Sequence, residues 1–308
     1  MLNAGSFTLI RSIAGALIMA SATPLLGQTP PTSDALKLVD EGLGRSGTTQ
    51  ADGVRRYSFP LSDLDVRMDG VAIQPALALG SWLAFQPMGK QAMVMGDLVL
   101  THDEVNPVMT ELLRGGVQVT ALHNHLLRSA PATMYLHVEA HGDPWTLAVA
   151  LKSALAKSRT PLSAPPQGDP QPLGLDTAGL DRLIGRHGKA NGGVYQFSIP
   201  RPDAPTSNGM PVPATMGTAT AINFQAADAG SAAATGDFVL TAEQVDPVIR
   251  ALRAANIEVT ALHNHMLDDQ PRLFFMHFWG HGDATKLGSG IRAALDAMTI
   301  KAGAANAG

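Results

Sequence analysis

The heptapeptide Val-Thr-Ala-Leu-His-Asn-His occurs twice in this chain, at residues 119–125 and at residues 259–265. The match continues without a gap between residues 96–143 and 236–283, where 22 of 48 positions are identical. Unrelated sequences of average composition would share only about three of them. The repeat is about one domain long, far above the roughly 20–50 residues of a solenoid unit. The sequence therefore predicts a tandem duplication.

The duplication divides the chain into two homologous halves, which we place at residues 34–160 and 173–300. Residues 161–172 between them are rich in proline, as is typical of a linker. Both halves then have ordinary domain size.

Residues 1–22 have the features of a secretory signal peptide. Arg11 precedes a short apolar run, and the small residues Ala20-Ser21-Ala22 follow it in the pattern of a cleavage site. The alternative is a single membrane anchor, but the run is shorter than the ~20 residues that a span requires. We expect a periplasmic or secreted protein with no membrane span after signal removal.

The composition is that of an ordinary globular protein, with 45% hydrophobic residues, 16% charged residues and a net charge of −4. This charge argues against a nucleic-acid partner. The chain has no cysteine, so disulfides, thiolate metal sites and lipid attachment at cysteine are excluded. The composition leaves a small-molecule or envelope ligand possible and does not identify one.

Periodicity within each half predicts an α+β fold, a mostly antiparallel sheet with helices on one face. In the first half, the expected helices cover residues 34–43, 107–114 and 144–157. The expected strands lie near residues 54–59, 82–87, 92–100, 117–126 and 132–141. Thr101–Glu104 has capping-box spacing, but Asn106-Pro107 also suits a helix start, and we place the start of that helix there.

Strand alternation would place Val117, Val119, Ala121, His123 and His125 on one face, and the second copy repeats this order. The histidines would then end the more apolar, covered face. A hairpin turning near residue 130 would place His123 about opposite His137, so that several imidazoles converge.

Eight histidines recur at fixed spacing in the two copies, and they are our candidate metal ligands: His123, His125, His137, His141, His263, His265, His277 and His281. Neutral imidazole suits divalent transition metals, and without cysteine zinc is the first expectation. Three ligands with an open position would make a catalytic zinc centre, and four would close it into a structural one. The alternative is a hydrogen-bonded cluster that ties the hairpin to the following helix. His141 and His281, at strand-to-helix junctions, are the weakest candidates.

Candidate acids and bases are less distinctive. Asp97 and its equivalent Asp237 could be turn residues, which we favour, or carboxylates that orient a metal-bound histidine. Asp143 suits a helix cap. Glu139 lies between two histidines but is replaced by Trp279 in the second copy, so a base at Glu139 would serve one half alone. No nucleophile elbow, phosphate loop or dinucleotide fingerprint is present.

The segments at residues 96–109, 119–125 and 274–283 resemble the LppY/LpqO-type family of bacterial secreted proteins and lipoproteins. The resemblance covers nearly all of the chain after the signal. It implies an exported bacterial protein with a duplicated domain of unknown function, and it supplies no catalytic roles. Unlike the lipoprotein members, this chain has no cysteine to acylate.

Three hypotheses about function follow. The first is an exported protein that binds a divalent metal, with one site per half or one site shared at the pseudo-twofold interface, its biochemical activity being unknown. The second is a metal-dependent hydrolase acting on the cell envelope or the environment. The third is a non-catalytic structural or ligand-binding module with hydrogen-bonded histidines. We favour the first, because the histidine pattern is strong and the acid–base constellation is weak.

Overall fold

The computed structural model describes Met1 and residues 34–163 and 171–299. The predicted signal peptide after Met1, most of the predicted linker and the tail after Thr299 lie outside the described residues. The described residues from Asp34 onward belong to one compact unit that contains both halves.

The first half forms a six-stranded antiparallel sheet with the order β1-β2-β5-β6-β8-β7. Its strands are β1 (Thr48–Thr49), β2 (Arg55–Pro60), β5 (Gly80–Met88), β6 (Gln91–Thr101), β7 (Gln118–His123) and β8 (Thr133–Gly142). Its long helices are α1 (Asp34–Leu43), α3 (His102–Arg114) and α4 (Pro144–Leu155).

The second half repeats this topology with the order β9-β10-β13-β14-β17-β15. Its strands are β9 (Lys189–Asn191), β10 (Val194–Pro200), β13 (Ala219–Ala226), β14 (Ala232–Leu240), β15 (Glu258–His263) and β17 (Phe274–Gly282). Its helices are α5 (Thr177–Ile184), α6 (Ala242–Ala254) and α7 (Ala284–Ala297), with the 3-10 turns η1 (Ala214–Met216) and η2 (Asp228–Gly230).

Each half also carries a short hairpin outside its main sheet. In the first half it consists of β3 (Arg67–Met68) and β4 (Val71–Ala72), followed by the one-turn helix α2 (Pro75–Ala78). In the second half it consists of β11 (Thr206–Ser207) and β12 (Met210–Pro211), and β16 (Asp269–Gln270) joins it as a third strand. Asp69 and Asn208 occupy the same left-handed position in the two hairpin turns, each with φ of 51°.

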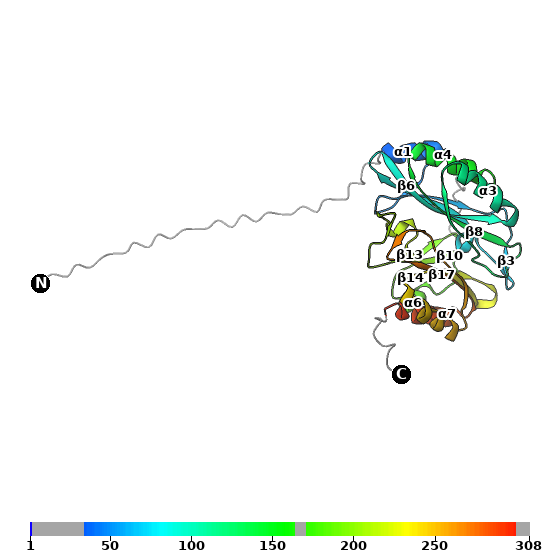
Figure 1. Ribbon diagram of the computed structural model, residues 1–308. Helices are drawn as coiled ribbons and strands as arrows, with labels where there is room; N and C mark the ends of the chain where they lie inside the picture. Colours follow the sequence, from blue (N-terminus) through cyan, green and yellow to red (C-terminus); the bar gives the residue numbers. More distant parts are fainter. Residues whose placement is uncertain (2–33, 164–170, 300–308) are drawn as a thin grey trace. The chain divides into compact units, whose positions relative to one another are not determined.

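The two faces of each main sheet are both buried, against different partners. In β6, Leu98 packs among the helices of its own half. Its neighbour Val99 shares a cluster with Trp279 of the second half, and Met95 shares one with Phe275. The layers are therefore helices, sheet, sheet and helices, with the two sheets facing each other (Figure 1). The predicted α+β class, with helices on one face of each sheet, is confirmed.

The start of α3 differs from the prediction. The helix begins at His102, because Thr101 and Glu104 form a complete capping box, in which the Glu104 carboxylate accepts a hydrogen bond from the backbone nitrogen of Thr101 at 2.8 Å. Pro107 then lies inside the helix. Two backbone groups satisfied by the box outweigh the preference of proline for a first helical position.

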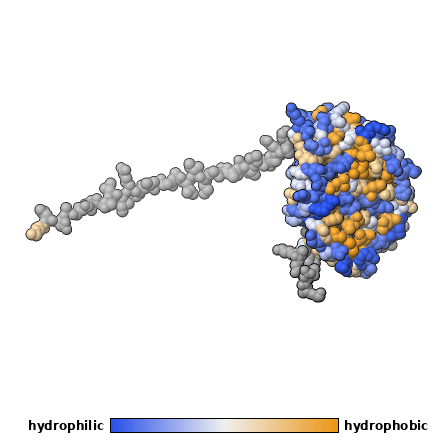
Figure 2. Space-filling model, in the orientation of Figure 1, coloured by the Kyte–Doolittle hydropathy of each residue, from blue (hydrophilic) through white to orange (hydrophobic). Residues whose placement is uncertain are grey.

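No helix in the described parts of the chain is long and apolar enough to cross a membrane. Figure 2 shows hydrophobic residues gathered in orange patches among hydrophilic ones on the face that is drawn. Exposed leucines recur at equivalent positions of the two halves: Leu122 and Leu262, and Leu127 and Leu267.

Candidate metal centre

A β-bulge in β7 decides which way the histidines of the heptapeptide point. Val119 pairs with Val138, but Ala121 pairs with His137, so Thr120 is the extra residue. The extra residue reverses the faces on which the later side chains of the strand lie. Strand β15 has the same irregularity between Val259 and Ala261. The expectation that His123 shares a face with Val119 is therefore wrong. His123 pairs with Tyr135 rather than His137, on the face turned toward the other half.

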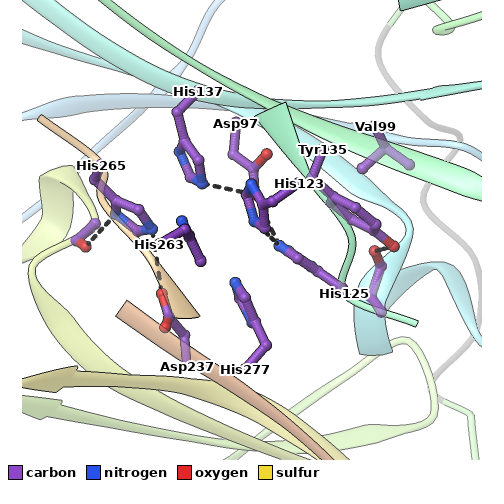
Figure 3. A network of polar contacts seen from close by, with 12 residues as sticks. Asp97, Val99, His123, His125, Tyr135, His137, Asp237, His263, His265 and His277 are labelled. Carbon is purple, nitrogen blue, oxygen red and sulfur yellow. Dashed lines mark hydrogen bonds and ion pairs between the residues drawn. The ribbon is translucent and has the colours of Figure 1, made fainter. Parts of the chain in front are cut away.

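Six histidines converge between the two sheets, three from each half (Figure 3). They form three close ring pairs across the interface, with centroids 3.6 Å apart for His123–His263 and His125–His277 and 3.9 Å apart for His137–His265. The duplication relates His123 to His263, His125 to His265 and His137 to His277. Each half therefore contributes the same three side chains to one shared cluster, which we call the histidine cluster.

The threonine and asparagine of the heptapeptide connect the halves beside this cluster. The Thr120 hydroxyl donates to the backbone oxygen of His265 at 2.7 Å. The Asn264 amide donates to the backbone oxygen of Thr120 at 2.9 Å. These contacts explain why the whole heptapeptide has a structural use, beyond its two histidines.

Backbone carbonyls fix the orientation of several rings. Nδ1 of His277 lies 2.8 Å from the Gly236 oxygen, Nδ1 of His265 lies 3.2 Å from the Gly217 oxygen, and Nδ1 of His263 lies 3.2 Å from the Asn264 oxygen. A carbonyl only accepts, so Nδ1 carries the proton in each ring and Nε2 keeps its lone pair. This is the tautomer in which Nε2 can bind a metal.

Many polar atoms of the cluster are buried and have no hydrogen-bond partner among the described residues. They are Nδ1 of His123, Nε2 of His137, His263, His265 and His277, and Oδ1 of Asp97 and Asp237. Leaving one such atom unsatisfied costs about 1–3 kcal/mol, and most buried polar groups in proteins are paired. So many in one place indicate that the cluster is built around a further partner.

The two equivalent aspartates lie inside strands. Asp97 in β6 pairs with His137, and Asp237 in β14 pairs with His277. The interpretation of both as turn residues is therefore wrong. An Asp97 carboxylate oxygen lies 3.7 Å from Nε2 of His125, and an Asp237 oxygen lies 3.3 Å from Nε2 of His265.

Burial controls the electrostatics of this region. It raises the pKa of Asp97 to about 8, with a smaller contribution from Asp237, and it also raises the pKa of Asp237. Burial lowers the pKa of all six imidazoles, that of His277 to about 3. The histidines are therefore neutral at pH 7, as metal ligands must be.

Four sets of three side chains have ligand atoms within 4.8 Å of one another. They are His123–His125–His277, His123–His137–His263, Asp97–His125–His137 and Asp237–His263–His265. The sets overlap, and no more than two of them can be chosen without sharing a residue. Nε2 of His123 and Nε2 of His125 are 3.0 Å apart. Two ligands of one tetrahedral zinc ion, with bonds of about 2.0–2.1 Å, have nitrogens about 3.3 Å apart.

The other predicted ligands lie outside the cluster. His141 and His281 are exposed near the ends of β8 and β17, and neither belongs to any of the four sets. Two other acidic residues that the sequence singled out also lie outside the cluster. Asp143 caps α4 as expected, accepting a hydrogen bond from the Thr146 backbone nitrogen at 2.8 Å. Glu139 is buried and bonds to Ser207 of the second half.

Two aromatic side chains were not predicted as part of the site. Tyr135 stacks on His125 and Phe275 stacks on His265, each with ring centroids 3.4 Å apart. Their equivalent positions in the duplication, two residues before His137 and His277, are the only signal that the sequence offers for them.

A family model described as "Domain of Unknown Function (DUF1259)" matches residues 37–157 and again residues 178–297. The chain therefore belongs to this family and contains its domain twice. No curated protein matches the chain.

Solved structures with some likeness include the trimeric bacterial microcompartment shell protein PduB and EtuB from Clostridium kluyveri. PduB is 9% identical over 82% of this chain and 90% of its own, with a TM-score of 0.22. EtuB is 9% identical over 81% of this chain and 88% of its own, with a TM-score of 0.23. Scores this low carry no argument about fold or function.

Proposed function

We propose that this protein binds a divalent transition metal in the histidine cluster, in a centre to which both halves contribute. The observation that carries the proposal is the set of buried ring nitrogens without a hydrogen-bond partner, one in each of five histidines. A metal ion would accept their lone pairs and remove the cost of leaving them unsatisfied.

Zinc is the ion that we expect first. The donor set consists of neutral imidazoles and two carboxylates, without thiolates, and zinc accepts both in tetrahedral sites. Copper would bind such nitrogen donors at least as strongly, so the metal in the cell also depends on supply. Bound zinc would supply a Lewis acid at the interface of the halves.

The histidines would act as ligands, and Asp97 and Asp237 would bind the ion or orient a ligand. Because the four sets overlap, two ions per chain is the upper limit for three separate ligands each. One ion held by His123, His125 and His277 would join both halves, since His277 comes from the second.

The test is the metal content of protein purified without a histidine tag. We expect zinc in the wild-type protein and little in the His123→Ala/His263→Ala double variant, which removes one ligand from each half. The matched control is His141→Ala/His281→Ala, which removes two equivalent exposed histidines. Equal metal in both double variants would overturn the proposal.

We also propose that the protein is exported from a bacterial cell and belongs to the LppY/LpqO-type branch suggested by its motifs. The support is the charged, apolar and small-residue order of residues 1–22 and the likeness of residues 96–109 and 274–283 to that family. Amino-terminal sequencing of the protein made in its own host tests export. A mature protein beginning after residue 22 in the periplasm or medium is expected, and a cytoplasmic protein retaining Met1 would contradict it.

A further inference from the structure

A second candidate site lies beside the edge strand β7, where the β11–β12 hairpin of the second half meets the first sheet. A pocket of about 440 Å³ opens there, lined by Gln118, Glu139, His141, Asn208 and Met210 among others. This volume is in the range of small-molecule sites.

Glu139 gives the pocket its chemistry. The residue is only 3% exposed, and its Oε1 accepts hydrogen bonds from Ser207 Oγ at 2.7 Å and Asn208 Nδ2 at 3.2 Å. Its other oxygen, Oε2, is buried without a partner. No cationic side chain of the described residues forms an ion pair with Glu139. A buried carboxylate without a counter-charge is costly unless something else supplies one.

The duplication provides an internal comparison, because the equivalent place beside the second sheet, where residues of both halves meet, is filled. Trp279 stands where Glu139 would be, and its indole nitrogen donates to Asp69 at 2.9 Å. The Arg128 guanidinium lies across the same place, donating to Asp69 at 2.9 Å and to Glu258 at 2.9 Å. The place beside the second sheet is thus filled by an aromatic ring of the second half, Trp279, and by a cation that the first half supplies, Arg128.

The pocket beside Glu139 lacks both. Gln118 faces Glu139 across the strands in the same register in which Glu258 faces Trp279. The equivalent of Asp69 is Asn208, at the same left-handed turn position. The equivalent of Arg128 is Asp268, so the cation has been replaced by an acid. The pocket beside Glu139 is therefore acidic, whereas the equivalent place beside Trp279 holds a guanidinium.

We propose that this pocket binds a small organic cation with a guanidinium or primary ammonium group, whose charge lies against Glu139. The cation would occupy the position that Arg128 occupies beside Trp279. Amides at Gln118 and Asn208 supply polar contacts, and Met210 supplies an apolar wall for a short aliphatic chain. The site is separate from the histidine cluster and does not depend on metal.

Calorimetric titration of the tag-free protein with agmatine, which carries both kinds of head group, tests the proposal. The neutral diol 1,4-butanediol is the matched probe without charge. We expect agmatine to bind with one site per chain and the diol to give no measurable heat. Zinc-loaded and chelator-treated protein should bind agmatine equally. Absence of agmatine binding, equal binding of the diol, or binding only to the zinc form would each overturn the proposal.

Variants separate this site from the rest of the surface. Glu139→Gln should weaken agmatine binding roughly tenfold or more, as expected for the loss of one charge-assisted contact. Glu139→Trp, which copies the second half, should abolish it. Gln118→Glu adds an acid at the exposed rim and should tighten binding, a gain that a structural role for the pocket would not produce.

Glu258→Gln is the matched control. It removes an acid beside Trp279, at the position equivalent to Gln118, and it should leave agmatine binding unchanged. Thermal melting establishes that each variant is folded. If Glu139→Trp does not fold, the opposite effects of Glu139→Gln and Gln118→Glu on agmatine affinity still test the proposal. Unchanged affinity in both of these variants would overturn the proposal.

Discussion

The imidazoles of His123 and His263 stack with their centroids 3.6 Å apart and their planes 19° from parallel. These residues are the first histidines of the two copies of one heptapeptide, 140 positions apart in the chain. Their contact means that neither half has a complete histidine cluster of its own. The duplication therefore created the site by bringing two sheets face to face, as well as doubling a domain.

Replacing Asp97 by asparagine should weaken metal binding without abolishing it. The carboxylate lies within 4 Å of both His125 and His137, and groups in that position commonly change metal affinity by about 10–100-fold. Zinc affinity measured by competition with a chromogenic chelator checks this. Asp143→Asn, at the cap of α4, is the control and should leave zinc affinity unchanged.

The metal-free protein should be most stable near pH 7. The unfolded chain takes up protons on its histidines below pH ~6.5, whereas burial keeps the folded imidazoles neutral, so acidification favours unfolding by about 1 kcal/mol per histidine between pH 7 and pH 5.5. Asp97 acts in the opposite sense. Its pKa rises from about 3.9 in the unfolded chain to about 8 in the folded one, so stability declines as pH rises through this interval.

Urea unfolding of chelator-treated protein at pH 5.5, 7 and 8.5 measures this profile. The six histidines dominate on the acid side because they outnumber the two aspartates. A free energy of unfolding that stays constant from pH 7 to pH 5.5 would contradict the burial of neutral imidazoles.

Gly236→Ala should be strongly destabilising. A Cβ at this position in β14 would lie 2.0 Å from the backbone oxygen of Ala221 in the neighbouring strand, and backbone cannot yield as a flexible side chain can. The expected loss is about 3 kcal/mol in the free energy of unfolding. Because His277 donates to the Gly236 oxygen, metal affinity should fall as well.

Gly142→Ala provides the matched comparison for this glycine. A Cβ there meets no atom within 4 Å, and the residue does not have a left-handed conformation. Its melting temperature should stay near that of the wild type. Similar losses in the two variants would show that the close approach of β13 and β14 is not the cause.

Tyr135→Phe should lower stability by about 1 kcal/mol and leave metal content unchanged. The hydroxyl donates to the Ala78 oxygen at 2.8 Å, and its loss leaves that carbonyl unpaired. The ring is the part that supports His125, and Phe275 supports His265 in the same way without a hydroxyl. Loss of metal in this variant would assign the hydroxyl a role in the centre itself.

The sequence predicts several helix boundaries and caps correctly, because these depend on neighbouring residues in the chain. Helix α1 has the predicted bounds Asp34–Leu43, and Asp143 caps α4 as its place before Pro144 indicates. The face of the histidines could not be predicted in the same way. Val117, Val119 and Ala121 read as a continuous alternation, and only the cross-strand register reveals that Thr120 is an extra residue.

The contact between the two halves also could not be predicted from the sequence. The heptapeptide indicates two equivalent clusters, but it does not say whether they remain apart or merge. That depends on the packing of both sheets through their helix-free faces, where Val99 meets Trp279. The packing of the two sheets also buries both faces of β6 and β14. It thereby makes the carboxylates of Asp97 and Asp237 part of the site.

The most direct test of a shared metal centre is the stoichiometry of zinc bound to the chelator-treated, tag-free protein, measured by titration and elemental analysis. Our proposal predicts one or two tightly bound ions per chain, and their loss when His123 and His263 are both replaced by alanine. A wild-type protein that retains no zinc after dialysis, or as much as the double variant retains, would contradict it.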